Sequence, residues 1–136
     1  MYLYVFFFFF VAVISAEASP TLPRHFSKAH DKCQSDPASH VDEAILDQVR
    51  RGEKVSAPNL PKHTLCMNIE TGVQSQNGDI IVENLRKLLE SAGADKEKVD
   101  EAISKCGTRS SAIAEEAAVA LTNCVIKYRP VRQHHD

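Results

Sequence analysis

DKEKVDEAISKCGTRSSAIAEEAAVALTNCVIKY, residues 95–128, is the stretch that decides the fold. Its first part, up to Cys106, carries apolar side chains at helical spacing on one face, as surface helices do. The part from Arg109 to about Tyr128 is apolar nearly all round, which is typical of a buried helix. The stretch therefore predicts a surface helix followed by a central helix, and each of the two carries one cysteine.

Four more amphipathic segments precede this stretch and are separated by proline, glycine and polar turns. Apolar side chains recur every three to four residues in the segments that span about 22–33, 39–51, 61–71 and 80–91. Gly52, Gly72 and Gly93 follow three of them, as expected at helix ends. No strand-like alternation and no internal repeat is present, so the sequence predicts an all-α fold of about six short helices.

The amino-terminal residues have the pattern of a secretory leader. Residues 3–14 are almost purely apolar, and small residues follow at Ser15, Ala16 and Ala18. The apolar run is shorter than the roughly 20 residues that a membrane anchor needs. We predict a signal peptide over residues 1–18, cleaved after Ala16 or Ala18, and an extracellular location. Residues 19–136 then form a single domain with a short polar tail from about residue 129.

Cysteine usage agrees with an oxidising compartment. The chain has four cysteines, an even number, and four cysteines allow three pairings that the residues alone do not rank. The gaps between them are wide and contain no C-x-x-C, which disfavours a zinc site. A nucleophilic cysteine would need an unpaired thiol, and an even count argues against one.

Charge and motifs exclude several functions. Sixteen Lys and Arg residues against eighteen Asp and Glu residues are spread along the chain, without the basic stripe that nucleic acid or an anionic membrane would need. No serine-hydrolase, zinc-protease or nucleotide-binding motif is present. We therefore expect no enzyme, no cofactor, no metal, no nucleic-acid partner and no stable membrane insertion.

The cysteine spacing resembles that of the insect pheromone and general odorant-binding protein family. Between Cys33 and Cys66 lie 32 residues, between Cys66 and Cys106 lie 39, and between Cys106 and Cys124 lie 17. The family has six cysteines, and its second and fifth positions fall here on Lys62 and Glu115. The chain is thus similar to the four-cysteine, or Minus-C, subclass.

This resemblance implies a disulfide pairing and raises one further hypothesis. The family's connectivity pairs Cys33 with Cys66 and Cys106 with Cys124. The lost third bridge would have joined the third helix to the sixth, so we expect a salt bridge between Lys62 and Glu115 in its place. The alternative is that both side chains point into water.

The resemblance also implies a function in olfaction or a related form of transport. The family binds small hydrophobic molecules such as odorants and pheromones in an apolar cavity among its helices. Inward apolar positions are the candidate ligand contacts, with core packing as the alternative for each: Ile45, Val49, Leu65, Ile69, Val82, Leu85, Leu89, Val99, Ile103, Ile113, Ala117, Leu121, Val125 and, with its hydroxyl, Tyr128.

The sequence also allows alternative functions. The chain would serve equally as a carrier of lipophiles in haemolymph or gland secretions, and a cavity-free secreted signalling or structural protein is a further alternative. Ligand identity, a membrane receptor and a homodimer are not decided by the residues. His25, His30 and His63 lie on predicted helices, and a histidine beside the cavity would link ligand release to pH. A surface position is the alternative for each of them.

Overall fold

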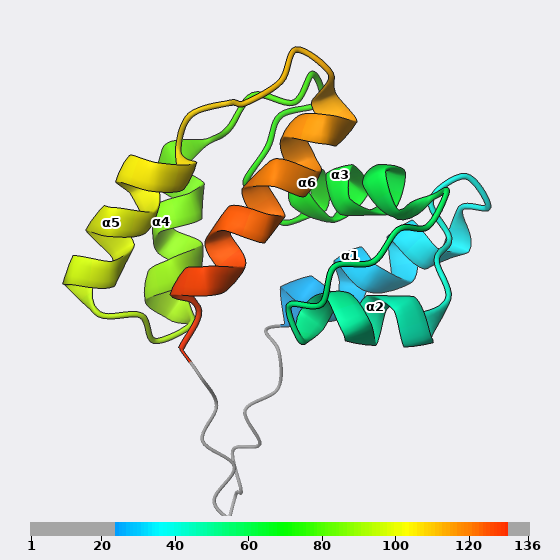
Figure 1. Cartoon of the computed structure of the whole chain (residues 1–136), viewed down its shortest axis with the longest axis horizontal. Coiled ribbons are helices and arrows are strands. Elements are labelled where there is room, and N and C mark those ends of the chain that lie inside the picture. Colours follow the sequence, from blue (N-terminus) through cyan, green and yellow to red (C-terminus); the bar gives the residue numbers. More distant parts are fainter. Residues whose placement is uncertain (1–23, 131–136) are drawn as a thin grey trace, which may run out of the picture.

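The computed structural model describes residues 24–130, and it is built from helices (Figure 1). The predicted leader, residues 1–18, lies outside the described residues. Within residues 24–130 there are six α-helices, one 3-10 helix and no strand, which confirms the predicted all-α fold. The elements are α1 (Arg24–Ser35), α2 (Glu43–Arg50), α3 (Leu60–Glu70), α4 (Val82–Ser91), α5 (Lys96–Cys106), α6 (Ala114–Val125) and the 3-10 helix η1 (Ile126–Tyr128).

Aspartate caps set the starts of two helices. The Asp42 carboxylate accepts the backbone N–H of Ala44 at 2.8 Å and begins α2, and Asp95 accepts the N–H of Lys98 at 2.9 Å and begins α5. The sequence predicted the second helix from Ser39, but α2 starts later. The Ser39 hydroxyl donates to the carbonyl of Cys33 at 2.6 Å, so this residue closes the turn after α1 instead.

Helix α6 also begins later than predicted, at Ala114 and not at Arg109. The Arg109 guanidinium donates to the carbonyls of Ser111 (2.7 Å) and Ala112 (2.8 Å), and thereby holds this segment as a loop. Ser111 then accepts the N–H of Ile113 at 3.1 Å. At the other end the last turn tightens into η1.

Helix α6 is central, as its apolar composition predicted. Figure 1 shows α4 and α5 side by side on one side of α6, and α1, α2 and α3 on the other. The helix packs against α3 and α5, and Ala117, Ala118 and Leu121 are buried. Small side chains at its contacts let the neighbouring helices approach closely.

Apolar side chains form two separate clusters. The larger cluster lies among α4, α5 and α6 and includes Leu85, Leu89, Val99 and Leu121, each less than 5% exposed. The smaller cluster joins α2 to the start of α3 and centres on Leu46.

Two disulfides fasten helices to one another. Cys33 pairs with Cys66 and joins α1 to α3, and Cys106 pairs with Cys124 and joins α5 to α6. These are the pairs that the family resemblance implied, and none of the four cysteines is free.

Candidate functional site

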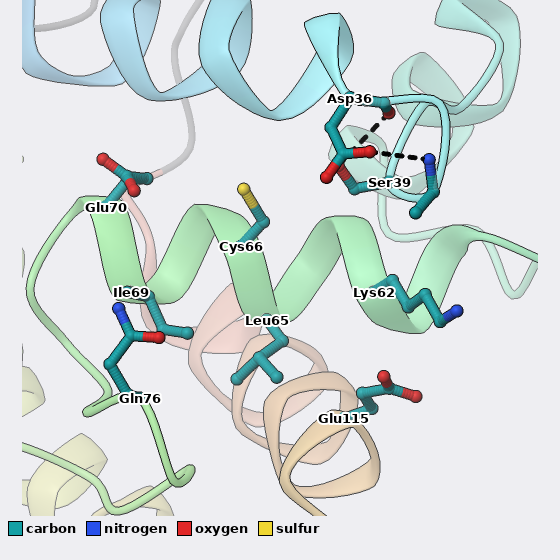
Figure 2. A pocket seen from close by; sticks show the side chains of 10 residues that line it. Asp36, Ser39, Lys62, Leu65, Cys66, Ile69, Glu70, Gln76 and Glu115 are labelled. Atoms are coloured by element: carbon teal, nitrogen blue, oxygen red, sulfur yellow. Dashed lines mark hydrogen bonds between the residues drawn. The ribbon is translucent and has the colours of Figure 1, made fainter.

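An open hollow lies over the outer face of α3 (Figure 2). Five of its residues come from one stripe of this helix, because positions three, four, seven and eight residues apart share a face. We call this feature the α3 hollow. Its volume is about 260 Å³, and it is lined by Asp36, Ala38, Ser39, Lys62, Leu65, Cys66, Ile69, Glu70, Gln76 and Glu115.

The floor of the α3 hollow is apolar at its middle. Leu65 and Ile69 are half-buried and lie on the stripe between Lys62 at one end of α3 and Glu70 at the other (Figure 2). Apolar side chains are thus spread around α3, which also packs against α1 and α6. The helix has no wholly polar side, and its third side forms the floor.

One wall of the hollow is the turn after α1. The backbone N–H of Ser39 donates to the Asp36 carbonyl at 3.0 Å, and the carboxylate of Asp36 accepts the N–H of Ala38 at 2.9 Å. The Nδ1–H of buried His63 donates to the Ser39 carbonyl at 2.9 Å and ties this turn to α3. Burial lowers the pKa of His63, and the hydrogen bond to Ser39 opposes that shift.

The facing wall combines the loop after α3 with the first turn of α6. Gln76 comes from this loop, and Glu115 comes from α6. Arg109 fastens the two segments together, because its Nη1 donates to the carbonyl of Asn77 at 2.8 Å and to the carboxylate of Asp79 at 3.0 Å. Both walls are therefore held by hydrogen bonds.

Carboxylates outnumber ammonium groups around the α3 hollow, and only some of these charged groups have a partner. Three carboxylates and one ammonium line it. Glu70 pairs with Lys32 at 2.5 Å, whereas the side chains of Lys62 and Glu115 have no hydrogen bond or ion pair within the described residues. Glu115 stands in the first turn of α6, where unpaired backbone N–H groups favour a negative charge.

A second hollow, of about 230 Å³, lies where the chain enters and leaves α2. Its lining comes from residues 40–42, from α2 and from residues 57–59: His40, Val41, Asp42, Ile45, Ala57, Pro58 and Asn59. It is similar in volume to the α3 hollow, but it is lined by a single carboxylate and no lysine or arginine.

Comparison with known proteins settles the family. The sequence model of the PBP/GOBP family matches residues 15–128, which include every helix described above. The chain belongs to the PBP/GOBP family. It is also 26% identical over 92 residues to the B2 protein of Tenebrio molitor, across 68% of this chain and 71% of that protein. No solved structure gives a significant match.

Most of the ligand contacts predicted for this PBP/GOBP chain are packed in the larger apolar cluster. Leu85, Leu89, Val99 and Leu121 are buried there, and Ile103, Val125 and Tyr128 pack against them. Ala117 is buried as well, on the central helix. None of these eight side chains lines either hollow.

Six predicted contacts lie elsewhere. Leu65 and Ile69 line the α3 hollow, Ile45 lines the second hollow, and Val49 packs on the smaller cluster. Val82 and Ile113 are 38% and 55% exposed. Val82 is the first residue of α4, and Ile113 is the N-cap that precedes α6.

The expected salt bridge between Lys62 and Glu115 is not formed. Both residues line the α3 hollow and lie near one another in Figure 2, as the lost bridge between α3 and α6 suggested. No ion pair within 4.0 Å joins them in the described part of the chain. The Lys62 ammonium is exposed to water, and the helix start stabilises the Glu115 carboxylate without a partner.

Sequence reasoning missed the loop residues of this site. Asp36, Ser39 and Gln76 reach the hollow only because the chain folds back over α3. The α3 stripe itself could have been found from the sequence, since its apolar positions lie between a charged residue at each end. Within residues 24–130 no helix is long and apolar enough to span a membrane, and no group of three metal-ligating side chains is present.

Proposed function

We propose that this protein binds small hydrophobic molecules reversibly and carries them, without catalysing a reaction. The observation that carries the proposal is the family match over residues 15–128, in a chain whose two disulfides join the helix pairs that the family resemblance implied. Odorants, pheromones and related lipophiles are the ligand class. Transport is the role, in sensory fluid or in haemolymph or gland secretions.

The α3 hollow is the site that we propose for the ligand. Its volume of about 260 Å³ lies just below the roughly 300 to 1,000 Å³ of typical ligand pockets, so the ligand must be small. The half-buried side chains of Leu65 and Ile69 provide an apolar surface for it. A ligand among α4, α5 and α6 would instead have to separate side chains such as Leu85 and Leu89, which are 1% exposed.

Secretion is part of the same proposal. The apolar leader over residues 3–14 and the small residues after it support export, and the two disulfides suit an oxidising compartment. Expression in insect cells, followed by amino-terminal sequencing of the protein recovered from the medium, tests this. A mature start at Glu17 or Ser19 is expected, and retention of residues 1–18 in the cell membrane would contradict it.

Displacement of the neutral dye Nile red tests carriage directly. The oxidised protein is titrated with the dye and then with medium-chain alcohols, aldehydes, fatty acids and small terpenes. Saturable binding that these compounds compete for is expected. Leu65→Ala and Ile69→Ala should each weaken binding several-fold, because about 0.8 kcal/mol is lost for each buried methylene group removed. Val82→Ala is the matched control, since Val82 is apolar but lies outside the hollow.

A cavity-free secreted signalling or structural protein is the second candidate. The cluster among α4, α5 and α6 favours it, because seven buried side chains of this cluster pack against one another. If the folded protein with both disulfides binds no dye, carriage is contradicted and this candidate takes its place.

A further inference from the structure

We infer that the α3 hollow selects small amphiphiles with a cationic head group, such as primary alkylammonium ions, over neutral alcohols and over fatty acids. The inference rests on the proposed function and names the ligand class of the same site. Two features of the hollow carry it: an apolar floor for the tail, and an excess of carboxylates around that floor for the head.

The floor suits an alkyl chain and not a purely polar ion. Leu65 and Ile69 are one helical turn apart, so together they offer a continuous apolar strip along α3 (Figure 2). A tail laid on this strip removes its own surface and that of both side chains from water. An inorganic cation would gain nothing from this floor, whereas the tail of an amphiphile would.

The surrounding charge distinguishes among head groups. Asp36, Glu70 and Glu115 line the hollow, against the single ammonium of Lys62. Glu70 is already paired with Lys32, and one oxygen of Asp36 accepts a backbone N–H. The carboxylate of Glu115 has no such partner among residues 26–130, so it is free to accept a hydrogen bond from an ammonium head.

Lys62 is the one cationic side chain that lines the hollow, and it would favour an anion. It is exposed and stands in the first turn of α3, at the opposite end of the stripe from Glu70 (Figure 2). A fatty-acid carboxylate that reached Lys62 would lie close to Glu115, which repels it. An ammonium head beside Glu115 is attracted by more than one carboxylate of the lining and repelled by one lysine.

Hydrogen bonds already hold both walls of the hollow in place without a ligand. His63 holds the turn that carries Asp36, and Arg109 holds the loop that carries Gln76 against the start of α6. A ligand therefore need not order these segments when it binds, which reduces the free-energy cost of binding.

Calorimetric titration of the oxidised protein with octylamine, octanol and octanoate at neutral pH tests the inference. Octylamine is protonated there, since alkylamine pKa values resemble that of lysine. We expect octylamine to bind about threefold more tightly than octanol, the effect typical of one exposed charge interaction, and octanoate to bind more weakly than octanol. Raising the salt to about 1 M should reduce the advantage of octylamine, because the screening length falls to roughly 3 Å.

Two variants with the same net charge locate the effect. Glu115→Gln should remove the preference for octylamine and leave octanol binding unchanged. Glu97→Gln, an exposed carboxylate on α5 outside the hollow, should leave the preference intact. Amide shifts in NMR spectra on adding octylamine should centre on Leu65, Ile69 and Glu115.

The outcomes separate this inference from the proposed function. If octanol or octanoate binds as tightly as octylamine, or if both variants lose the preference equally, the cationic selectivity is overturned while carriage stands. If none of the three compounds binds and Nile red does not bind either, carriage itself is overturned together with the inference.

Discussion

At the residue scale, Gly78 is a position where the loop after α3 approaches the first residue of α6 closely. Its φ is +95°, and a Cβ added there would lie 2.7 Å from the Cβ of Ala114 and 2.8 Å from its Cα. We expect Gly78→Ala to lower the free energy of unfolding by about 3 kcal/mol, from backbone strain and from the clash together. Urea unfolding followed by circular dichroism measures this loss.

Gly93 provides the control for that prediction. Its φ of +90° is similar, but an added Cβ would meet nothing within 4 Å. Gly93→Ala should therefore cost about 1 kcal/mol, from backbone strain alone. Equal losses in the two variants would show that the close approach of Gly78 to Ala114 does not matter for stability.

His63 should make stability depend on pH. Burial lowers its pKa below the ordinary value of 6.5, so the unfolded chain binds a proton more readily than the folded protein does. Stability is then fully present above about pH 6.5 and is lost as the pH falls from there toward the folded-state pKa. The neighbouring charged and titratable groups are His30, whose ring lies 6.0 Å away, Glu43, which hydrogen-bonds to His30, and Arg50.

Urea unfolding at about pH 7.5 and about pH 5.5 measures this dependence. His63→Asn should lose less stability between the two than the wild type, because the buried titrating group is gone. His40→Asn changes an exposed ring and should keep the wild-type dependence. If the stability of His63→Asn depended on pH as strongly as that of the wild type, another titrating group would be responsible.

At the scale of elements, the helices were predictable because each carries its own local signals. Gly52, Gly72 and Gly93 mark the ends of α2, α3 and α4, and Asp95 marks the start of α5. The starts of α2 and α6 were missed because contacts with other segments decide them. Ser39 hydrogen-bonds back to α1, and Arg109 binds carbonyls of two different loops.

The candidate site was predictable only in its floor. Leu65 and Ile69 follow from the periodicity of α3, whereas Asp36 and Gln76 reach the hollow through the path of two loops. Val82 and Ile113 fit the apolar period of their helices but stand at helix starts, where no neighbouring helix covers them. Periodicity indicates a face, and it does not tell whether another element covers that face.

Arg109 should be the side chain that joins the loop after α3 to α6. Its guanidinium donates to three carbonyls and to the carboxylate of Asp79, and the side chain is 25% exposed. We expect Arg109→Ala to cost about 2 kcal/mol in urea unfolding, since hydrogen bonds to charged groups contribute more than neutral ones. Arg51→Ala, which removes an exposed pair with Glu53, should cost less than about 0.5 kcal/mol. A similar small loss for both would contradict this role.

At the scale of the whole molecule, α3 connects two apolar clusters of unequal size. The cluster among α4, α5 and α6 contains seven buried residues, and the cluster between α2 and the start of α3 contains three. Each disulfide fastens one side: Cys33–Cys66 holds α1 on α3, and Cys106–Cys124 holds α5 on α6. The smaller side buries less apolar surface, so it depends more on its disulfide.

Amide hydrogen exchange of a disulfide variant tests this dependence. Replacing both Cys33 and Cys66 with alanine opens a loop of 33 residues and should remove about 3 to 4 kcal/mol. We expect amides of α2 to lose this whole amount of protection, and amides of α4 and α5 to lose less, because the larger cluster holds them without α1. The variant without Cys106 and Cys124 should show the opposite ranking. If the amides of all helices lost equal protection in both variants, the helices would open as one unit. Each disulfide would then stabilise the whole fold through α3.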